Sequence, residues 1–203
     1  MSKDETPDNA AGLQWSPQID KMLANWCDEA KCFEWMHSES YSRYSKRATV
    51  MTIGSNITIS LTGIANLVLG VTVSDATTTS MIFGCVSIGI GVVNMIQQQF
   101  GWTTLANNYK VSAKQWSEIS RKVQEQLVIP PTARKDCATF LKYIKQDMTL
   151  ASEHNSNLPK DIRQKCFEKF NTIPNFNVPD ICGQIEHTAV YLEQPLLNQV
   201  VVQ

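Results

Sequence analysis

The amino-acid sequence predicts an all-α protein with three parts: a two-helix transmembrane hairpin, long amphipathic helices on the cytoplasmic side, and an irregular C-terminal tail. Three observations lead to this prediction. Residues 48–109 contain a single charged side chain, Asp75, whereas 18% of the 203-residue chain is charged. Apolar residues on both sides of this block recur at alternating spacings of three and four, which is the period of a helix. Beyond residue 171, prolines interrupt any such period.

The N-terminal part consists of a tail and a helix. Residues 1–15 are polar and nearly free of large apolar side chains, which predicts a disordered tail. Ser16 and Pro17 predict a helix start, because serine caps free backbone N–H groups and proline fits the first turn. The helix expected over residues 16–47 has one largely apolar face: Ile19, Leu23, Trp26, Ala30, Phe33, His37, Ser40 and Tyr44. Such a face packs on other elements.

The charge-poor block, residues 48–99, predicts two helices joined by a polar turn around Asp75. Each helix has an apolar surface and a stripe of small or polar residues. In a bilayer, small residues let two helix backbones approach, and polar side chains bond across their interface. We therefore expect the helices to pack through an interhelical seam formed by Ser55, Thr62, Gly63, Asn66, Gly84, Ser87, Gly91 and Asn94. The alternative is a hairpin buried inside a soluble helical bundle.

Basic residues flank the predicted hairpin and indicate its orientation. Arg43, Lys46 and Arg47 precede the first span, Lys110 and Lys114 follow the second, and the turn between the spans has neither lysine nor arginine. The positive-inside rule then places both ends of the hairpin on the cytoplasmic side. The expected location is a membrane, with the lipid bilayer as a partner.

A helical arm is expected over residues 100–170. No proline occurs between Ser80 and Ile129, so the second span is expected to continue into the arm as one helix. Pro130 and Pro131 end that helix. Two further amphipathic helices are expected, with inward residues Cys137, Phe140, Leu141, Ile144 and Met148 in one and Ile162, Cys166 and Phe170 in the other.

The last segment, residues 171–203, predicts an extended tail that becomes ordered only on a partner. Pro174, Pro179 and Pro195 break it, and its composition is too polar for another core. The side chains expected to contact the partner are the apolar ones near the end: Tyr191, Leu192, Leu196, Leu197, Val200, Val201 and Val202. The final valines favour addition as a strand to a partner.

Sequence motifs for catalysis are absent. The chain has no phosphate-binding P-loop, no H-E-x-x-H zinc motif and no G-x-S-x-G nucleophile motif. The six cysteines include no C-x-x-C pair and the three histidines are scattered, so we expect no metal site and no cofactor. Reduced thiols are expected, with a disulfide between Cys166 and Cys182 as the alternative. The 18 basic and 19 acidic residues indicate no nucleic-acid partner, and we expect a protein that is not an enzyme.

A set of residues between Trp26 and Phe170 follows the order of helices in one known family. They are Trp35, His37, Tyr41, Ser60, Leu61, Thr62, Gly63, Leu105, Trp116, Ile119, Leu127, Pro131, Arg134, Phe140, Leu141, Ile144, Leu158, Pro159, Ile162 and Phe170. In these residues the chain resembles the SLATT-like proteins with two transmembrane helices, and most of all the subgroup encoded by large nucleocytoplasmic DNA viruses.

The resemblance implies a structural membrane protein of a large DNA virus, a minor capsid protein that links the internal membrane to the capsid shell. Capsid or other virion proteins would be its partners, and it would also form homo-oligomers. Its location would be the interface between virion inner membrane and capsid, and host cytoplasmic membranes during assembly. The alternative is a pore-forming or membrane-perturbing effector of the SLATT type, and a soluble helical scaffold is a third hypothesis. No catalytic residue follows from the resemblance.

Overall fold

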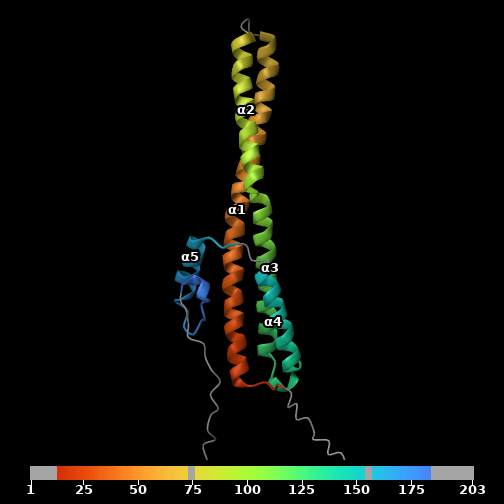
Figure 1. The fold of residues 1–203 in the computed structure, drawn as a ribbon, viewed down its shortest axis with the longest axis vertical. Helices are drawn as coiled ribbons and strands as arrows, with labels where there is room; N and C mark the ends of the chain where they lie inside the picture. The colour runs from red at the N-terminus through yellow and green to blue at the C-terminus, as the bar shows by residue number, and fades with distance from the viewer. Residues whose placement is uncertain (1–12, 73–75, 154–156, 184–203) are drawn as a thin grey trace, which may run out of the picture.

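The computed structural model describes residues 13–72, 76–153 and 157–183, and this part of the chain is helical without strands. It confirms the predicted all-α class. The elements are α1 (Pro17–Thr72), α2 (Ala76–Phe100), α3 (Trp102–Val128), α4 (Cys137–Glu153) and α5 (Lys160–Phe170), with two short 3-10 turns, η1 (Pro131–Ala133) and η2 (Asp180–Cys182). Figure 1 shows that they form an elongated molecule.

Helix α1 is the axis of the molecule. Its 56 residues span about 84 Å at the rise of an α-helix. The Ser16 side chain accepts a hydrogen bond from the backbone N–H of Ile19 at 3.3 Å, as expected of a capping residue. Helix α1 continues through residues 47 and 48 without a break, so the expected amphipathic helix and the first helix of the hairpin are one continuous helix (Figure 1).

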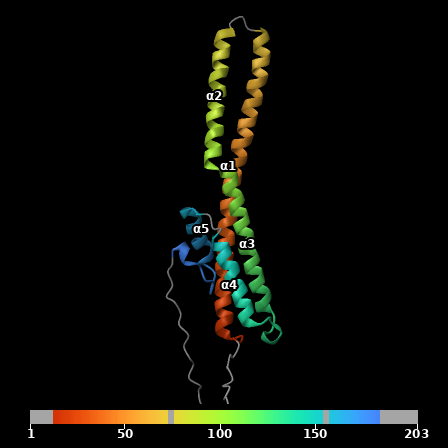
Figure 2. The same cartoon turned by 45° about the vertical axis from the view of Figure 1, so that its right-hand side comes forward.

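The first half of α1 belongs to a helical bundle. Here α3 runs along α1, α4 packs on α3, and α5 packs on α1 (Figures 1 and 2). Most of the predicted apolar face of α1 is buried there. The larger of two core clusters consists of Ala30, Cys32, Phe33, Met36, Tyr109, Trp116, Ile119, Ala151, Leu158, Ile162, Cys166, Val178 and Cys182. The smaller cluster consists of Leu23, Cys27, Val123, Phe140 and Ile144.

The second half of α1 and helix α2 form the hairpin half of the molecule. The two helices run side by side and extend beyond the bundle (Figure 2). The expected continuous helix from the second span into the arm is wrong, because Gly101 separates α2 from α3 with φ 55° and ψ 32°. Glycine adopts this left-handed conformation at little cost because it has no Cβ. A helix can therefore break here without proline.

The first part of the predicted C-terminal tail differs from the expectation of an extended chain. Within residues 171–183, the side chains of Val178 and Cys182 are buried in the larger core cluster. The Asn177 backbone N–H donates to an Asp28 carboxylate oxygen at 3.4 Å. Apart from the short 3-10 turn η2, this segment forms no helix, but its apolar side chains still pack into the core. The seven predicted contact residues from Tyr191 to Val202 lie outside the described residues, as do residues 1–12.

Candidate membrane-facing surface

The hairpin half has no buried side chain among its described residues between 49 and 100. Most of the large apolar side chains that the described chain exposes lie there: Val50, Ile53, Ile57, Ile59, Leu61, Ile64, Met81, Ile82, Val86, Ile88, Val92, Val93, Met95, Ile96 and Phe100. Ile88 and Met81 are 70% and 73% exposed, whereas Trp116 in the bundle is 1% exposed. The hairpin half therefore exposes its large apolar side chains, whereas the bundle buries them.

Helix α1 is long and apolar enough to cross a membrane, by length and composition. Among the described residues it is the one helix that meets this criterion, and 6% of its most apolar stretch is buried. Helix α2 contains a shorter apolar stretch, Met81–Ile96, within its 25 residues. The rest of α2 is uncharged, and most of it is polar: three threonines and Ser80 near one end and three glutamines near the other.

The residues of the predicted interhelical seam differ in their exposure. Ser55, Thr62 and Asn94 are half-buried, and the Asn66 side chain lies outside the described residues. The other predicted members are exposed: Gly63, Gly84, Ser87 and Gly91. A Cβ added at any of these three glycines would meet no heavy atom of the rest of the chain within 4 Å. The expected close approach of the helix backbones at the glycines is therefore not found.

Larger side chains are half-buried in the hairpin half. On α2, Phe83, Ile90 and Asn94 are half-buried at spacings of seven and four, which marks one helical face. Ala65 of α1 lies on the corresponding face with Thr62. The half-buried face of α2 therefore carries Phe83 and Ile90, whereas Gly84 and Gly91 are exposed. In the sequence, the large apolar residues Phe83 and Ile90 are the signal for this face.

Basic and aromatic side chains gather where the bundle meets the hairpin half, a region that we call the neck. Arg43 forms a two-pronged ion pair with Asp161 of α5, with Nη1 3.0 Å from Oδ1. This hydrogen-bonded guanidinium holds the pKa of the Asp161 carboxyl below its usual value. The Arg47 guanidinium lies 5.7 Å from the centre of the Tyr44 ring. Cations and aromatic rings of this kind are typical of a membrane–water interface.

Two of the cavities in the described part of the chain open on the neck. One, of about 440 Å³, is lined by Lys46, Arg47, Val50, Met51 and Trp102. The other, of about 410 Å³, lies between α1 and α3 and is lined by Tyr41, Ser45, Ala48, Thr49, Thr52, Ile53, Thr103, Ala106, Asn107 and Lys110. The first cavity has apolar walls with cations at one end, and the second is rich in hydroxyl groups.

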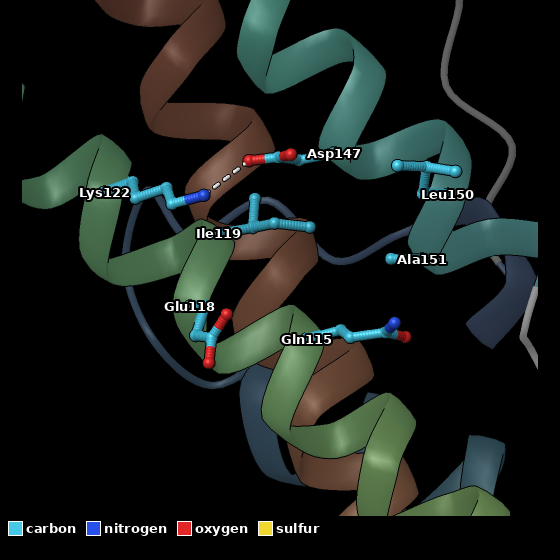
Figure 3. Close-up of a pocket in the computed structure, with 7 residues that line it drawn as sticks. All are labelled: Gln115, Glu118, Ile119, Lys122, Asp147, Leu150 and Ala151. Carbon is cyan, nitrogen blue, oxygen red and sulfur yellow. Dashed lines mark hydrogen bonds and ion pairs between the residues drawn. The ribbon is translucent and has the colours of Figure 1, made fainter.

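A smaller cavity, of about 180 Å³, lies in the bundle between α3 and α4. Figure 3 shows its lining, with Gln115, Glu118 and Lys122 on α3 and Asp147, Leu150 and Ala151 on α4. The Lys122 ammonium lies 2.7 Å from an Asp147 carboxylate oxygen, so its charge is already compensated. The lining contains no histidine, cysteine or hydroxyl group, and hence no pair of a nucleophile with a base.

His37 and Tyr109 are buried in the core, where they pack against neighbouring side chains. The His37 ring is buried between Phe33 and Tyr109, with ring centres 6.4 Å and 5.8 Å away. The Tyr109 hydroxyl donates to the Asn157 carbonyl at 2.8 Å. Burial raises the pKa of Tyr109 to about 12, so the phenol stays protonated and acts as a donor.

All six cysteines are free thiols, and five of them are buried. Cys182 Sγ lies 3.8 Å from Met36 Sδ. A hydrogen bond with Cys166 and burial raise the pKa of the Cys182 thiol, which keeps it protonated and unreactive. No group of three or more His, Cys, Asp or Glu side chains in the described part of the chain could hold a metal ion.

Many of the residues that support the resemblance to SLATT-like proteins are core residues. Trp116, Ile144 and Ile162 are examples, and each is at most 2% exposed. Core positions report on packing more than on a particular function. No protein-family model, no curated protein and no solved structure matches this chain. The family resemblance therefore stays a prediction.

Proposed function

We propose that this protein is a membrane anchor without enzymatic activity, in which a two-span hairpin holds the helical bundle at the membrane surface. The observation that carries the proposal is the exposed apolar surface between Val50 and Phe100. Soluble monomers rarely expose contiguous apolar patches beyond about 300–600 Å², and this surface runs along residues 50–64 of α1 and 81–100 of α2. A bilayer would remove it from water.

The lengths of the helices fit this proposal. Residues 48–72 of α1 and the 25 residues of α2 each span roughly 37 Å, and the hydrocarbon core of a bilayer is about 30 Å thick. The polar ends of α2 would then lie among the lipid headgroups. Both helices satisfy their backbone hydrogen bonds internally, which a bilayer requires. The basic neck would face the cytoplasm.

In its finer form the proposal follows the family resemblance. The protein would be a minor capsid protein of a large DNA virus that links the internal membrane to the capsid shell. Because α1 continues from the hairpin into the bundle, residues 17–47 form a rigid spacer of roughly 45 Å on the cytoplasmic side. The residues beyond Gly183 would bind a capsid protein.

The second candidate is a pore-forming effector. The outward faces of Gly63, Gly84 and Gly91 favour it, because small residues on a lipid-facing surface allow another hairpin to pack closely. Leakage of a dye from liposomes by the purified full-length protein would support this function. Recovery of the protein in purified virions, with release only by detergent, would support the linker.

Cysteine labelling tests the two-span hairpin. The native thiols Cys27, Cys137 and Cys166 are buried and unsuited to the test, so Thr78 and Lys145 are replaced singly by cysteine in a Cys85→Ser background. In sealed vesicles of known orientation, an impermeant maleimide should label the two positions from opposite sides. Labelling of both from one side, or extraction of the protein by alkaline carbonate, would contradict the hairpin.

A further inference from the structure

The neck cavity lined by Val50, Met51 and Trp102 has a composition that suits one class of ligand. Its walls are apolar, and Lys46 and Arg47 stand at its bundle-side end. It is open to the surface and has a volume of about 440 Å³. A ligand for this cavity must therefore be apolar over part of its length and anionic at one end.

The break at Gly101 places Trp102 in this cavity. The left-handed backbone of Gly101 ends α2 at Phe100 and starts α3 at Trp102, which then lines the cavity beside Val50 and Met51 of α1. The Phe100 and Trp102 rings stack with centres 5.6 Å apart. A continuous helix would direct the tryptophan elsewhere, so the cavity depends on the glycine.

In the described part of the chain, no carboxylate holds the two cations at the cavity, although the Arg47 guanidinium lies over the Tyr44 ring. Among the described residues, no carboxylate forms an ion pair with Lys46 or Arg47, whereas the neighbouring Arg43 is paired with Asp161. Both side chains are exposed. The next residue along the chain, Ala48, begins the charge-poor block, so the cations lie at the level where lipid phosphates would meet the proposed hairpin.

We infer that this cavity binds one anionic phospholipid, with its phosphate on Lys46 and Arg47 and the start of an acyl chain against Val50, Met51 and Trp102. The inference rests on the proposed function, because it places the hairpin in a bilayer. A small soluble anion would gain nothing from the apolar walls, and a zwitterionic lipid would gain less from the two cations. Anionic headgroups are attracted to juxtamembrane basic residues.

Native mass spectrometry of the full-length protein tests this site. The protein is released from vesicles that contain phosphatidylserine and phosphatidylcholine, and the retained lipids are counted. We expect one phosphatidylserine per chain, with saturation, and no comparable retention of phosphatidylcholine. The double variant Lys46→Gln/Arg47→Gln should bind phosphatidylserine about 30-fold more weakly, since each basic residue near a membrane surface contributes roughly fivefold.

A variant that fills the cavity distinguishes specific lipid binding in the cavity from general attraction of anionic lipids to the basic residues. Val50 is 69% exposed, so Val50→Trp can fill the cavity without a change in charge or in the bundle core. It should abolish retention of phosphatidylserine. Matched controls are Lys142→Gln/Lys145→Gln, which removes two exposed cations of the bundle, and Ile64→Trp, which adds a tryptophan at an exposed position away from the neck. Both should retain the lipid.

The experiments distinguish a failure of the proposed hairpin from a failure of the lipid site. If wild-type protein does not insert into phosphatidylcholine vesicles in an alkaline-extraction assay, the proposed hairpin fails. If it inserts but retains both lipids equally, or if Val50→Trp retains phosphatidylserine as wild type does, the lipid site fails and the hairpin stands. Displacement of the lipid by an equal concentration of inorganic phosphate would also overturn the lipid site.

Discussion

Truncation of Trp116 tests whether the bundle is held together by the packing of α1 on α3. The Trp116 ring is 1% exposed and stacks on Phe33 of α1 with ring centres 4.6 Å apart. Replacement of a buried tryptophan by alanine costs about 3–5 kcal/mol, because apolar contacts are lost and a cavity remains. A domain of this size has a free energy of unfolding of about 5–15 kcal/mol. Trp116→Ala should therefore remove a large part of the stability of the bundle.

The native thiols provide the assay. Cys32 is fully buried in the same cluster as Trp116, so it reacts with a thiol reagent only when the bundle opens. A loss of about 4 kcal/mol corresponds to roughly 10³-fold faster labelling of Cys32 in the folded protein, since 1.4 kcal/mol is a factor of ten. Insertion of the hairpin into vesicles should not change, because no described side chain between 49 and 100 is buried in the bundle.

The matched control is Val111→Ala on the same helix. Val111 is 46% exposed, and surface substitutions usually change the stability by less than about 0.5 kcal/mol, so labelling of Cys32 should change by less than about threefold. Equal labelling rates in Trp116→Ala and wild type would refute the packing of α1 on α3 described above. Loss of membrane insertion in Trp116→Ala would contradict the expectation that insertion does not require the intact bundle core.

Three further predictions concern the neck, the far end of the bundle and its thiols. Gly101→Ala should destabilise the protein by about 1–2 kcal/mol in denaturant unfolding, because a Cβ is strained at φ 55°, and an unchanged midpoint would contradict the left-handed break. Arg134→Ala should lower the free energy of unfolding by about 2–3 kcal/mol in the same assay. The reason is that the buried guanidinium donates to Asp20 at 2.6 Å and to the Ile129 carbonyl at 2.7 Å. Lys145→Ala, which removes an exposed cation, is the control. The pKa of the Cys182 thiol is raised in the folded state, so its contribution to stability is complete below the ordinary thiol pKa of 9.0 and is lost as the pH rises above it. Chemical unfolding at pH 7 and pH 10 should show this loss in wild type and a smaller one in Cys182→Ala.

Sequence patterns predicted much of the fold because they are local. The helical period of α1 and the proline pair after Ile129 predicted elements that the structure contains. The buried face from Leu23 to Ser40 was likewise readable, since a helix that packs along its length repeats its apolar positions. The half-buried face of α2 was harder to predict. The helix carries both a face with Phe83 and Ile90 and a stripe of small residues, and the sequence does not say which of the two turns inward.

By itself the sequence determined the all-α class and the separation of a charge-poor hairpin from charged helices, because composition and period need no knowledge of distant contacts. The tertiary structure alone decided the break at Gly101, since glycine permits a left-handed residue but does not require one. It also decided that the segment with Val178 and Cys182 folds back onto Met36 of α1. That contact joins residues almost 150 positions apart, and its free energy comes from a shared core that exists only after the helices have packed.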